Sequence, residues 1–220
     1  VEQVFEAAIG EFGSLDILVN NAGICVLEDF LSADSFENRD KHFDINIKGT
    51  WNVTKSAIKY MKKRNASIIN LSSVTGPMVA DSGEVAYATT KAAILGFTKA
   101  LAREVIDDDI RVNAIMPGYI RTPMVDKMAI ESSPNNPDSV IEGISSAIPM
   151  KRLGTIEELG ELAAFLACDE SSYITGQGIV NINKSDVAGK INLNIPVKIS
   201  TGRLISTIRP SYRTAYALVR

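Results

Sequence analysis

The amino-acid sequence predicts an α/β fold in which a parallel sheet is covered by helices on both faces. Three short runs, 16–20, 67–71 and 110–116, are predominantly apolar, which is typical of strands buried on both faces. Between them lie longer stretches with apolar residues at helical spacing, long enough to cross from one strand to the next. Strands that alternate with helices in this order predict right-handed βαβ units in one domain.

The spacing of apolar residues also predicts the other elements. Residues 1–12 repeat apolar side chains at i, i+3, i+4 and i+7, which predicts an amphipathic helix. Thr155 and Glu158 have the spacing of a capping box, at the start of a helix over 155–168. Further elements are expected over 35–63, 84–106 and 138–147 (helices) and 178–182 (strand). Loops rich in turn-forming residues are expected over 72–83 and 123–137, the second of them mobile and beside the functional site.

Composition and charge narrow the classes of function. The chain has 220 residues, a net charge of −3, 45% hydrophobic residues and 22% charged residues, as in an ordinary globular domain. This charge gives no general signal for nucleic-acid binding, and no apolar run reaches the roughly 18 residues of a membrane span. Cys25 and Cys168 lack metal-ligand spacing, so we expect reduced thiols in a cytoplasmic protein. We expect His42, the single histidine, to lie on the surface or pack between helices rather than act in catalysis.

The stretch from Ser72 to Lys91 holds a candidate proton-transfer site. On a helix, Tyr87 and Lys91 would share one face because they are four residues apart. A phenol ordinarily has a pKa of about 10, and a nearby ammonium group would lower it. The Ser73 hydroxyl would hold a substrate oxygen near Tyr87, which gives an acid–base site without metal or histidine. The same spacing is also typical of an ordinary solvated helix face, so the surrounding sequence decides between the two.

Three polar segments follow the three predicted strands. Asn20–Gly23 follow the first strand, Ser72 and Ser73 the second, and Pro117–Thr122 the third. In a parallel sheet, ligands bind at the carboxyl ends of the strands, which lie at one edge. The helix of Tyr87 begins just after the second of these segments. This convergence favours a functional role for Tyr87 over a solvated helix face.

Together these motifs resemble those of the classical short-chain dehydrogenase/reductase family. In chain order they are NNAG (20–23), Asn46 in DINIKG, Ser73 in LSSVTG, YATTK (87–91) and PGYIRT (117–122). The resemblance covers about residues 1–180 and implies a Rossmann-like doubly wound parallel sheet. It also implies an NAD(P)-dependent oxidoreductase that interconverts a small-molecule carbonyl and alcohol, without nucleic-acid or membrane partners. Such proteins form homo-oligomers, tetramers or dimers, through the helices at 35–63 and 84–106 and the C-terminal strand.

The resemblance implies a role for each matching residue. Tyr87 would donate and accept the proton, Lys91 would lower the pKa of Tyr87 and bind the nicotinamide ribose, and Ser73, rather than Ser72, would position the substrate oxygen. Asn46 would hold a water molecule in a proton relay to Lys91. Besides Tyr87 and Lys91, the cofactor would contact Asn20, Ala22 and Gly23 at its adenosine side and Pro117, Gly118, Ile120 and Thr122 at its nicotinamide end.

Several of these residues have a simpler structural interpretation. Asn20 would also brace the strands, Asn46 would cap or bend its helix, and Thr122 would start a turn before Pro123. Four methionines would form either an apolar substrate wall or ordinary packing: Met116, Met124, Met128 and Met150.

The start of the chain departs from the family pattern. The family opens with a strand and a TGxxxGxG turn that holds the pyrophosphate at a helix N-terminus, and no such motif is present. We therefore expect the first βα units to be lacking, and with them the residue that selects between NAD and NADP. We also expect one edge of the sheet to be uncovered. Weak binding of NAD(P)H by this 220-residue chain would follow. The alternative to an oxidoreductase is an inactive remnant or interaction module.

The sequence divides into a partial family domain over 1–183 and an atypical basic tail over 184–220. The tail has seven basic residues and one acidic residue, and it follows a strand without the family's Asp-Gly-Gly ending. It is expected to be β-rich or disordered, and a fused or frameshifted segment is the favoured interpretation. A nucleic-acid-binding or partner-binding extension is the alternative, although aromatic residues are sparse (Tyr212 and Tyr216).

Overall fold

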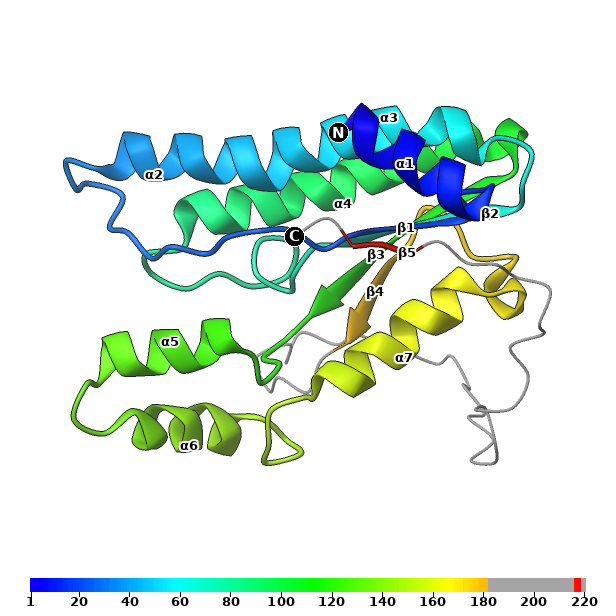
Figure 1. Cartoon of the computed structure of the whole chain (residues 1–220). Coiled ribbons are helices and arrows are strands. Elements are labelled where there is room, and N and C mark those ends of the chain that lie inside the picture. Colours follow the sequence, from blue (N-terminus) through cyan, green and yellow to red (C-terminus); the bar gives the residue numbers. More distant parts are fainter. Residues whose placement is uncertain (182–215, 219–220) are drawn as a thin grey trace.

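The computed structural model describes residues 1–181 and 216–218, and it contains a five-stranded parallel sheet (Figure 1). The spatial order of the strands is β4-β3-β2-β1-β5. Their bounds are β1 (Ile17–Asn20), β2 (Ala66–Leu71), β3 (Ile110–Pro117), β4 (Gly178–Asn181) and β5 (Tyr216–Leu218). The predicted α/β fold is confirmed, and the first four strands lie where the sequence predicts them.

Helices cover both faces of the sheet (Figure 1). One face carries α1 (Glu2–Phe12), α3 (Thr50–Met61) and α4 (Val85–Val105), and the other carries α7 (Ile156–Ala167). The helix predicted over 35–63 consists of α2 (Ser35–His42), a π-helical segment η1 (Phe43–Gly49) and α3. Two 3-10 turns, η2 (Ile106–Asp108) and η3 (Asp169–Ser171), follow α4 and α7. In the described part of the chain, no helix has the length and apolarity needed to cross a membrane.

Apolar side chains fill the space on both sides of the sheet. Leu18 and Ile68 are fully buried on the side of α1, α3 and α4. Ile69, Ile115 and Leu166 are fully buried on the side of α7. Because Ile68 and Ile69 are neighbours in β2 yet face opposite sides, this strand is buried on both faces, as its apolar sequence predicts.

The stretch 123–137, predicted as a mobile loop, is largely helical. It contains α5 (Pro123–Ser132) and the start of α6 (Pro137–Ala147), and the two helices pack together beyond the carboxyl edge of the sheet (Figure 1). The Thr122 hydroxyl accepts a hydrogen bond from Val125 N at 3.4 Å and caps α5. The loop prediction was wrong because Pro123 and Pro137 begin helices, where the missing N–H of proline is tolerated.

The expectation that one sheet edge is uncovered is also wrong over three residues of β1. β5 pairs with β1 in parallel, with Ile17, Leu18 and Val19 opposite residues 216–218. The backbone groups on this side of β1 are therefore paired. The other residues of the predicted basic tail, 182–215 and 219–220, lie outside the described residues, so the origin and role of the tail stay predictions.

A row of buried polar side chains crosses the sheet near its carboxyl edge. Asn20 Nδ2 donates to Thr54 Oγ1 and to Asn70 Oδ1, both at 2.8 Å. Asn70 Nδ2 in turn donates to Thr98 Oγ1 at 2.9 Å. The row links α3, β1, β2 and α4, so the expectation that Asn20 braces the strands is confirmed. Asn70 has an equal part in the row, which the sequence did not reveal.

Asn70→Ala should destabilise the fold because it removes one hydrogen-bond partner each from the buried side chains of Asn20 and Thr98. Loss of hydrogen bonds to buried polar groups costs about 1–3 kcal/mol, and urea unfolding measures this loss in the free energy of unfolding. Asn52→Ala, a change at an exposed position of α3, is the matched control and should stay within about 0.5 kcal/mol of the parent. Equal stabilities of the two variants would contradict a stabilising role of the polar row.

Candidate active site

The predicted motifs gather at the carboxyl edge of the sheet. β1, β2 and β3 are parallel neighbours, so the segments that follow them leave the sheet at the same edge. These segments are 20–23, 72–73 and 117–122, and α4 begins beside them. Asn46 comes from η1, which packs against α4. The structure therefore brings the predicted catalytic residues to one region.

Tyr87, Lys91 and Ser73 lie together at the start of α4. Lys91 Nζ is 5.6 Å from the centroid of the Tyr87 ring, and the hydroxyls of Tyr87 and Ser73 are hydrogen-bonded. Lys91 is only 7% exposed, and its Nζ donates to the backbone oxygen of Leu71 at 2.8 Å. The Ser72 hydroxyl instead donates to the backbone oxygen of Lys91 at 2.7 Å. Ser73, rather than Ser72, therefore faces the phenol.

The loop that carries Ser73 is fixed against α4 by a glycine. The Ser73 hydroxyl accepts a hydrogen bond from Thr75 N at 3.1 Å. Gly76 has a φ of +98°, and a Cβ at this residue would lie 2.1 Å from the backbone oxygen of Ala88. Any side chain here would therefore displace the loop from α4 and move Ser73 relative to Tyr87.

Burial, rather than the Tyr87–Lys91 pair, determines the pKa values at this site. Burial raises the pKa of Tyr87 to about 12, the hydrogen bond from Ser73 lowers it, and the charges of Cys25 and Glu84 raise it further. Burial also lowers the pKa of Lys91 to about 8. The expectation that the pKa of Tyr87 falls is therefore wrong for the geometry seen here, because desolvation opposes the phenolate.

Asn46 holds the segment that follows β1. Its Oδ1 accepts from Ile24 N at 2.8 Å, and its Nδ2 donates to Ile24 O and to Thr90 Oγ1, both at 3.0 Å. A Cβ on Gly23 would lie 3.3 Å from Asn46 Oδ1 and 3.5 Å from Lys91 Nζ, so the backbone of Gly23 passes between these groups. The π-helical form of η1 agrees with the interpretation that Asn46 bends its helix. Its water-mediated relay stays a prediction.

The residues predicted to hold the adenosine side differ in accessibility. The Asn20 side chain is buried and engaged in the polar row, so it does not face a ligand from solvent. Ala22 is exposed and Gly23 is half-buried, which leaves their backbone accessible at the end of β1.

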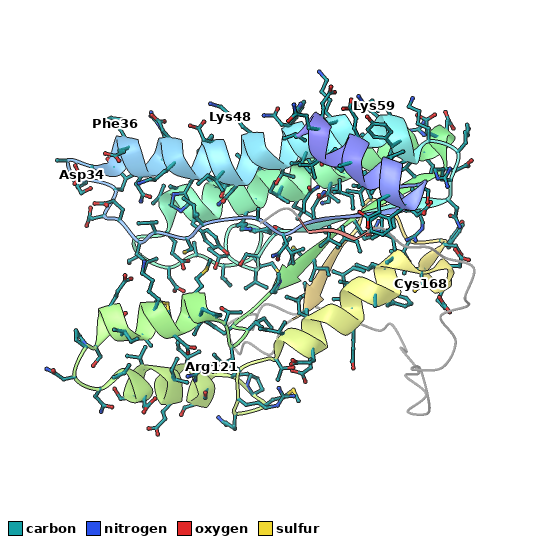
Figure 2. All side chains as sticks on the ribbon, viewed as in Figure 1. Asp34, Phe36, Lys48, Lys59, Arg121 and Cys168 are labelled. Carbon is teal, nitrogen blue, oxygen red and sulfur yellow. The ribbon has the colours of Figure 1, made fainter. Side chains whose placement is uncertain are left out.

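The segment 117–122 is tied to its neighbours. Gly118 N donates to Asn181 O at 3.0 Å, Ile120 is buried and bridges to Gly154, and Thr122 caps α5. This agrees with the interpretation that Thr122 starts a turn before Pro123, since Thr122 caps the first turn of α5. Pro117 and Gly118 are half-buried, and Arg121 next to them is paired with Asp126 at 2.7 Å (Figure 2). The contacts of Pro117, Gly118, Ile120 and Thr122 with a nicotinamide stay predictions.

The residues at this edge fit the nicotinamide end of NAD(P). A buried ammonium group at Lys91 suits hydroxyl acceptors such as those of a ribose, and Gly23 allows close approach because it lacks a side chain. The pyrophosphate has no such counterpart, since the glycine-rich turn that would bind it is not in the sequence.

Lys91→Met should alter the dependence of stability on pH. Because burial lowers the pKa of Lys91 from 10.5 to about 8, the unfolded chain binds more protons between these values, so stability rises with pH there. The raised pKa values of Cys25 and Tyr87 act in the opposite direction, but both groups are present in the parent and in the variant, so the difference between the two proteins reports Lys91. Between pH 8 and 10 the parent should gain about 2 kcal/mol relative to the variant. Urea unfolding across this range, with Lys99→Met as an exposed control on α4, measures the difference; a constant difference would contradict the burial of the charge.

The chain is similar in sequence to one known protein family and to several characterised or named proteins. The profile of the family described as Enoyl-(Acyl carrier protein) reductase matches residues 1–181. Oxidoreductase UcpA of Salmonella typhimurium is 58% identical over 165 residues, which are 74% of this chain and 62% of that protein. The 3-oxoacyl-[acyl-carrier-protein] reductase FabG of Thermotoga maritima is 42% identical over 180 residues, 81% of this chain and 69% of that protein. The chain thus spans less than two thirds of the UcpA relative that it matches.

Solved structures show the same fold. The ligand-free aldohexose dehydrogenase of Thermoplasma acidophilum has a TM-score of 0.78 and 33% identity, with 84% of this chain and 73% of that chain covered. ElxO with NADP bound has a TM-score of 0.71 and 34% identity, with 81% and 70% covered. NAD+-bound xylitol dehydrogenase has a TM-score of 0.74 and 29% identity, with 83% and 73% covered. By its sequence motifs, the profile match and these relatives, the chain belongs to the classical short-chain dehydrogenase/reductase family.

Proposed function

We propose that the protein is an NAD(P)-dependent oxidoreductase that interconverts a carbonyl and an alcohol. The observation that carries this proposal is the buried group formed by Ser73, Tyr87 and Lys91. A hydrogen-bonded pair of hydroxyls beside a buried ammonium group, with pKa values shifted by burial, is an arrangement typical of proton-transfer sites.

In the proposed reduction, each residue of the site has a separate role. Ser73 holds the carbonyl oxygen of the substrate, and Tyr87 donates its proton to that oxygen. When bound, the nicotinamide supplies the hydride to the carbonyl carbon or accepts it from the alcohol. The hydride on carbon and the proton on oxygen complete the alcohol. Lys91 stabilises the tyrosinate that remains, and the water relay at Asn46 returns the proton through Lys91.

The substrate class is proposed from the relatives and the surroundings of the site. Relatives named for 3-oxoacyl, aldohexose, levodione and xylitol substrates support a panel of small ketones, aldoses and 3-oxoacyl thioesters. Met124 on α5 and Met150 after α6 are about half exposed and form the apolar part of the proposed substrate wall. Relatives bind NADP or NAD+, so both cofactors belong in the test. The free cysteines support the placement of the protein in the cytoplasm.

Tyr87→Phe should reduce kcat/KM for carbonyl reduction by about 10²- to 10⁴-fold, because the proton donor is lost while the ring stays. Steady-state kinetics of the protein with the substrate panel, NADH and NADPH measure this effect. Tyr173→Phe is the matched control because Tyr173 is fully exposed at 102%. Undiminished activity of Tyr87→Phe would refute the mechanism. A parent without activity on the whole panel would favour the alternative of a non-catalytic interaction module.

We further propose that a second copy of the chain covers the outer face of α3 and α4. Trp51 is 54% exposed, and its ring lies against that of Phe97 with centroids 5.2 Å apart and an interplanar angle of 42°. The small residues Ala92, Gly96 and Ala100 of α4 are also exposed. Small residues at this spacing allow two helices to approach closely.

Gly96→Arg should therefore shift the protein from oligomer to monomer in sedimentation velocity. No atom lies within 4 Å of a Cβ at Gly96 or at Gly10, so both positions accept a side chain within one copy. Gly10→Arg on α1 is the matched control and should leave the oligomer intact. An unchanged sedimentation coefficient for Gly96→Arg would refute this interface.

A further inference from the structure

The segment that follows β1 is held by side chains of one helix instead of by another strand. Asn38, His42 and Asn46 are spaced four residues apart along α2 and η1. Asn46 bonds both backbone groups of Ile24, as described above. His42 Nε2 accepts from Val26 N at 3.2 Å, and Asn38 Nδ2 donates to Val26 O at 3.3 Å. The backbone of 24–26 is thus paired on one side by three polar side chains.

The hydrogen bonds of His42 define its tautomer. His42 is fully buried, and its Nε2 receives the N–H of Val26, so Nε2 carries no proton. Its Nδ1 lies 2.8 Å from the backbone oxygen of Asn38 and therefore donates to it. The imidazole is neutral, and each nitrogen has one backbone partner.

His42 also borders the proton donor. Its ring meets the ring of Tyr87 edge to face, with centroids 6.4 Å apart and an interplanar angle of 72°. On the same segment, Cys25 lies close enough to Tyr87 and Lys91 for its charge to act on both. Further along, Glu28 N donates to Gly83 O at 3.0 Å, which joins the segment to the loop before α4. Residues 24–28 are therefore tied to η1 at one end and to the loop before α4 at the other, with Cys25 near Tyr87 and Lys91.

We propose that His42 is a positioning residue of the active site, whose neutral imidazole fixes residues 24–28 and the Tyr87 ring relative to each other. The imidazole holds the segment through its hydrogen bond with Val26 N, and its edge-to-face contact with the Tyr87 ring restricts the position of that ring. Because its side chain is fully buried, it would act through Val26 and Tyr87 and not by contact with substrate or cofactor. Its effect on catalysis rests on the proposed function, whereas its effect on the segment does not.

The hydrogen bond between His42 and the segment can be tested without any enzymatic activity, through the tautomer of the imidazole. The chain has one histidine, so a long-range ¹H–¹⁵N spectrum of the parent contains one imidazole system, in which we expect the Nδ1–H tautomer. An Nε2–H tautomer would overturn the proposal, because Nε2 then could not accept from Val26. This arm needs no variant and so does not depend on how well a variant folds.

The two cysteines report on the segment in the same chain. Cys25 is half-buried, and burial raises the pKa of its thiol to about 11, so its alkylation by iodoacetamide should be slow. Cys168 is exposed at the far end of α7 and is the internal control (Figure 2). His42→Ala should speed alkylation of Cys25 about tenfold, the equivalent of one lost hydrogen bond, and leave Cys168 unchanged. His42→Gln, which keeps an acceptor for Val26, should stay close to the parent. An unchanged Cys25 rate in His42→Ala would overturn the proposal.

Kinetics then separate positioning from plain stability. In carbonyl reduction, His42→Ala should lower kcat about tenfold at a temperature where its fold is intact, and His42→Gln should restore most of this loss. A lower melting temperature with unchanged kcat would overturn the catalytic part, since His42 would then be structural only. If the parent reduces no carbonyl, the proposed function fails, and the tautomer and the Cys25 rates still decide whether His42 positions the segment.

Discussion

The burial of the Lys91 ammonium group is the constraint on which the geometry of the site depends. A charge removed from water is costly unless hydrogen bonds replace its solvation, and Lys91 Nζ finds the backbone oxygen of Leu71 at the end of β2. The backbone oxygen of Lys91 accepts in turn from Ser72. These two bonds join α4 to the loop after β2. Since Tyr87 lies one turn earlier on α4 and Ser73 one residue after Ser72, the same bonds set the distance between the hydroxyls of Tyr87 and Ser73.

Helix α2 and the π-helical segment η1 supply hydrogen-bond partners for the backbone that follows β1. Beyond Asn20 the chain leaves the sheet, so its N–H and C=O groups need partners that no strand supplies. Side chains of α2 and η1 take this role, and the Thr50 hydroxyl donates to the backbone oxygen of Asn46 at 2.9 Å within the π-helical region. Gly23 precedes this segment and lies close to Lys91, since a Cβ there would be 3.5 Å from Lys91 Nζ. The side chains of α2 and η1 thus fix residues 24–26, while the backbone of Gly23 lies next to Lys91.

Apolar spacing was sufficient to predict most of the fold, because burial on two faces leaves a clear pattern in the strands and on the long helices. It failed at Pro123, where a residue that usually breaks helices begins one, and at β5, whose partner β1 is nearly two hundred residues away in sequence. The parallel order of the strands was enough to predict that Ser73, Tyr87 and Lys91 meet. The roles of Asn70 and His42 were hidden because their partners are distant in the chain, and no local pattern signals them.

The direction of the Tyr87 pKa shows most clearly what residue spacing leaves out. Four residues on a helix bring Lys91 Nζ to 5.6 Å from the centroid of the Tyr87 ring, but the loss of solvent around the phenol has the largest effect on its pKa and opposes ionisation. The charge of Glu84 raises the pKa further, and the phenol keeps its proton at neutral pH. In the proposed reaction, a protonated Tyr87 would give its proton to a carbonyl oxygen held by Ser73. An alcohol, by contrast, needs the phenolate as a base. In the proposed reaction, reduction therefore starts from the protonated phenol that burial favours, and oxidation requires the phenolate that burial disfavours.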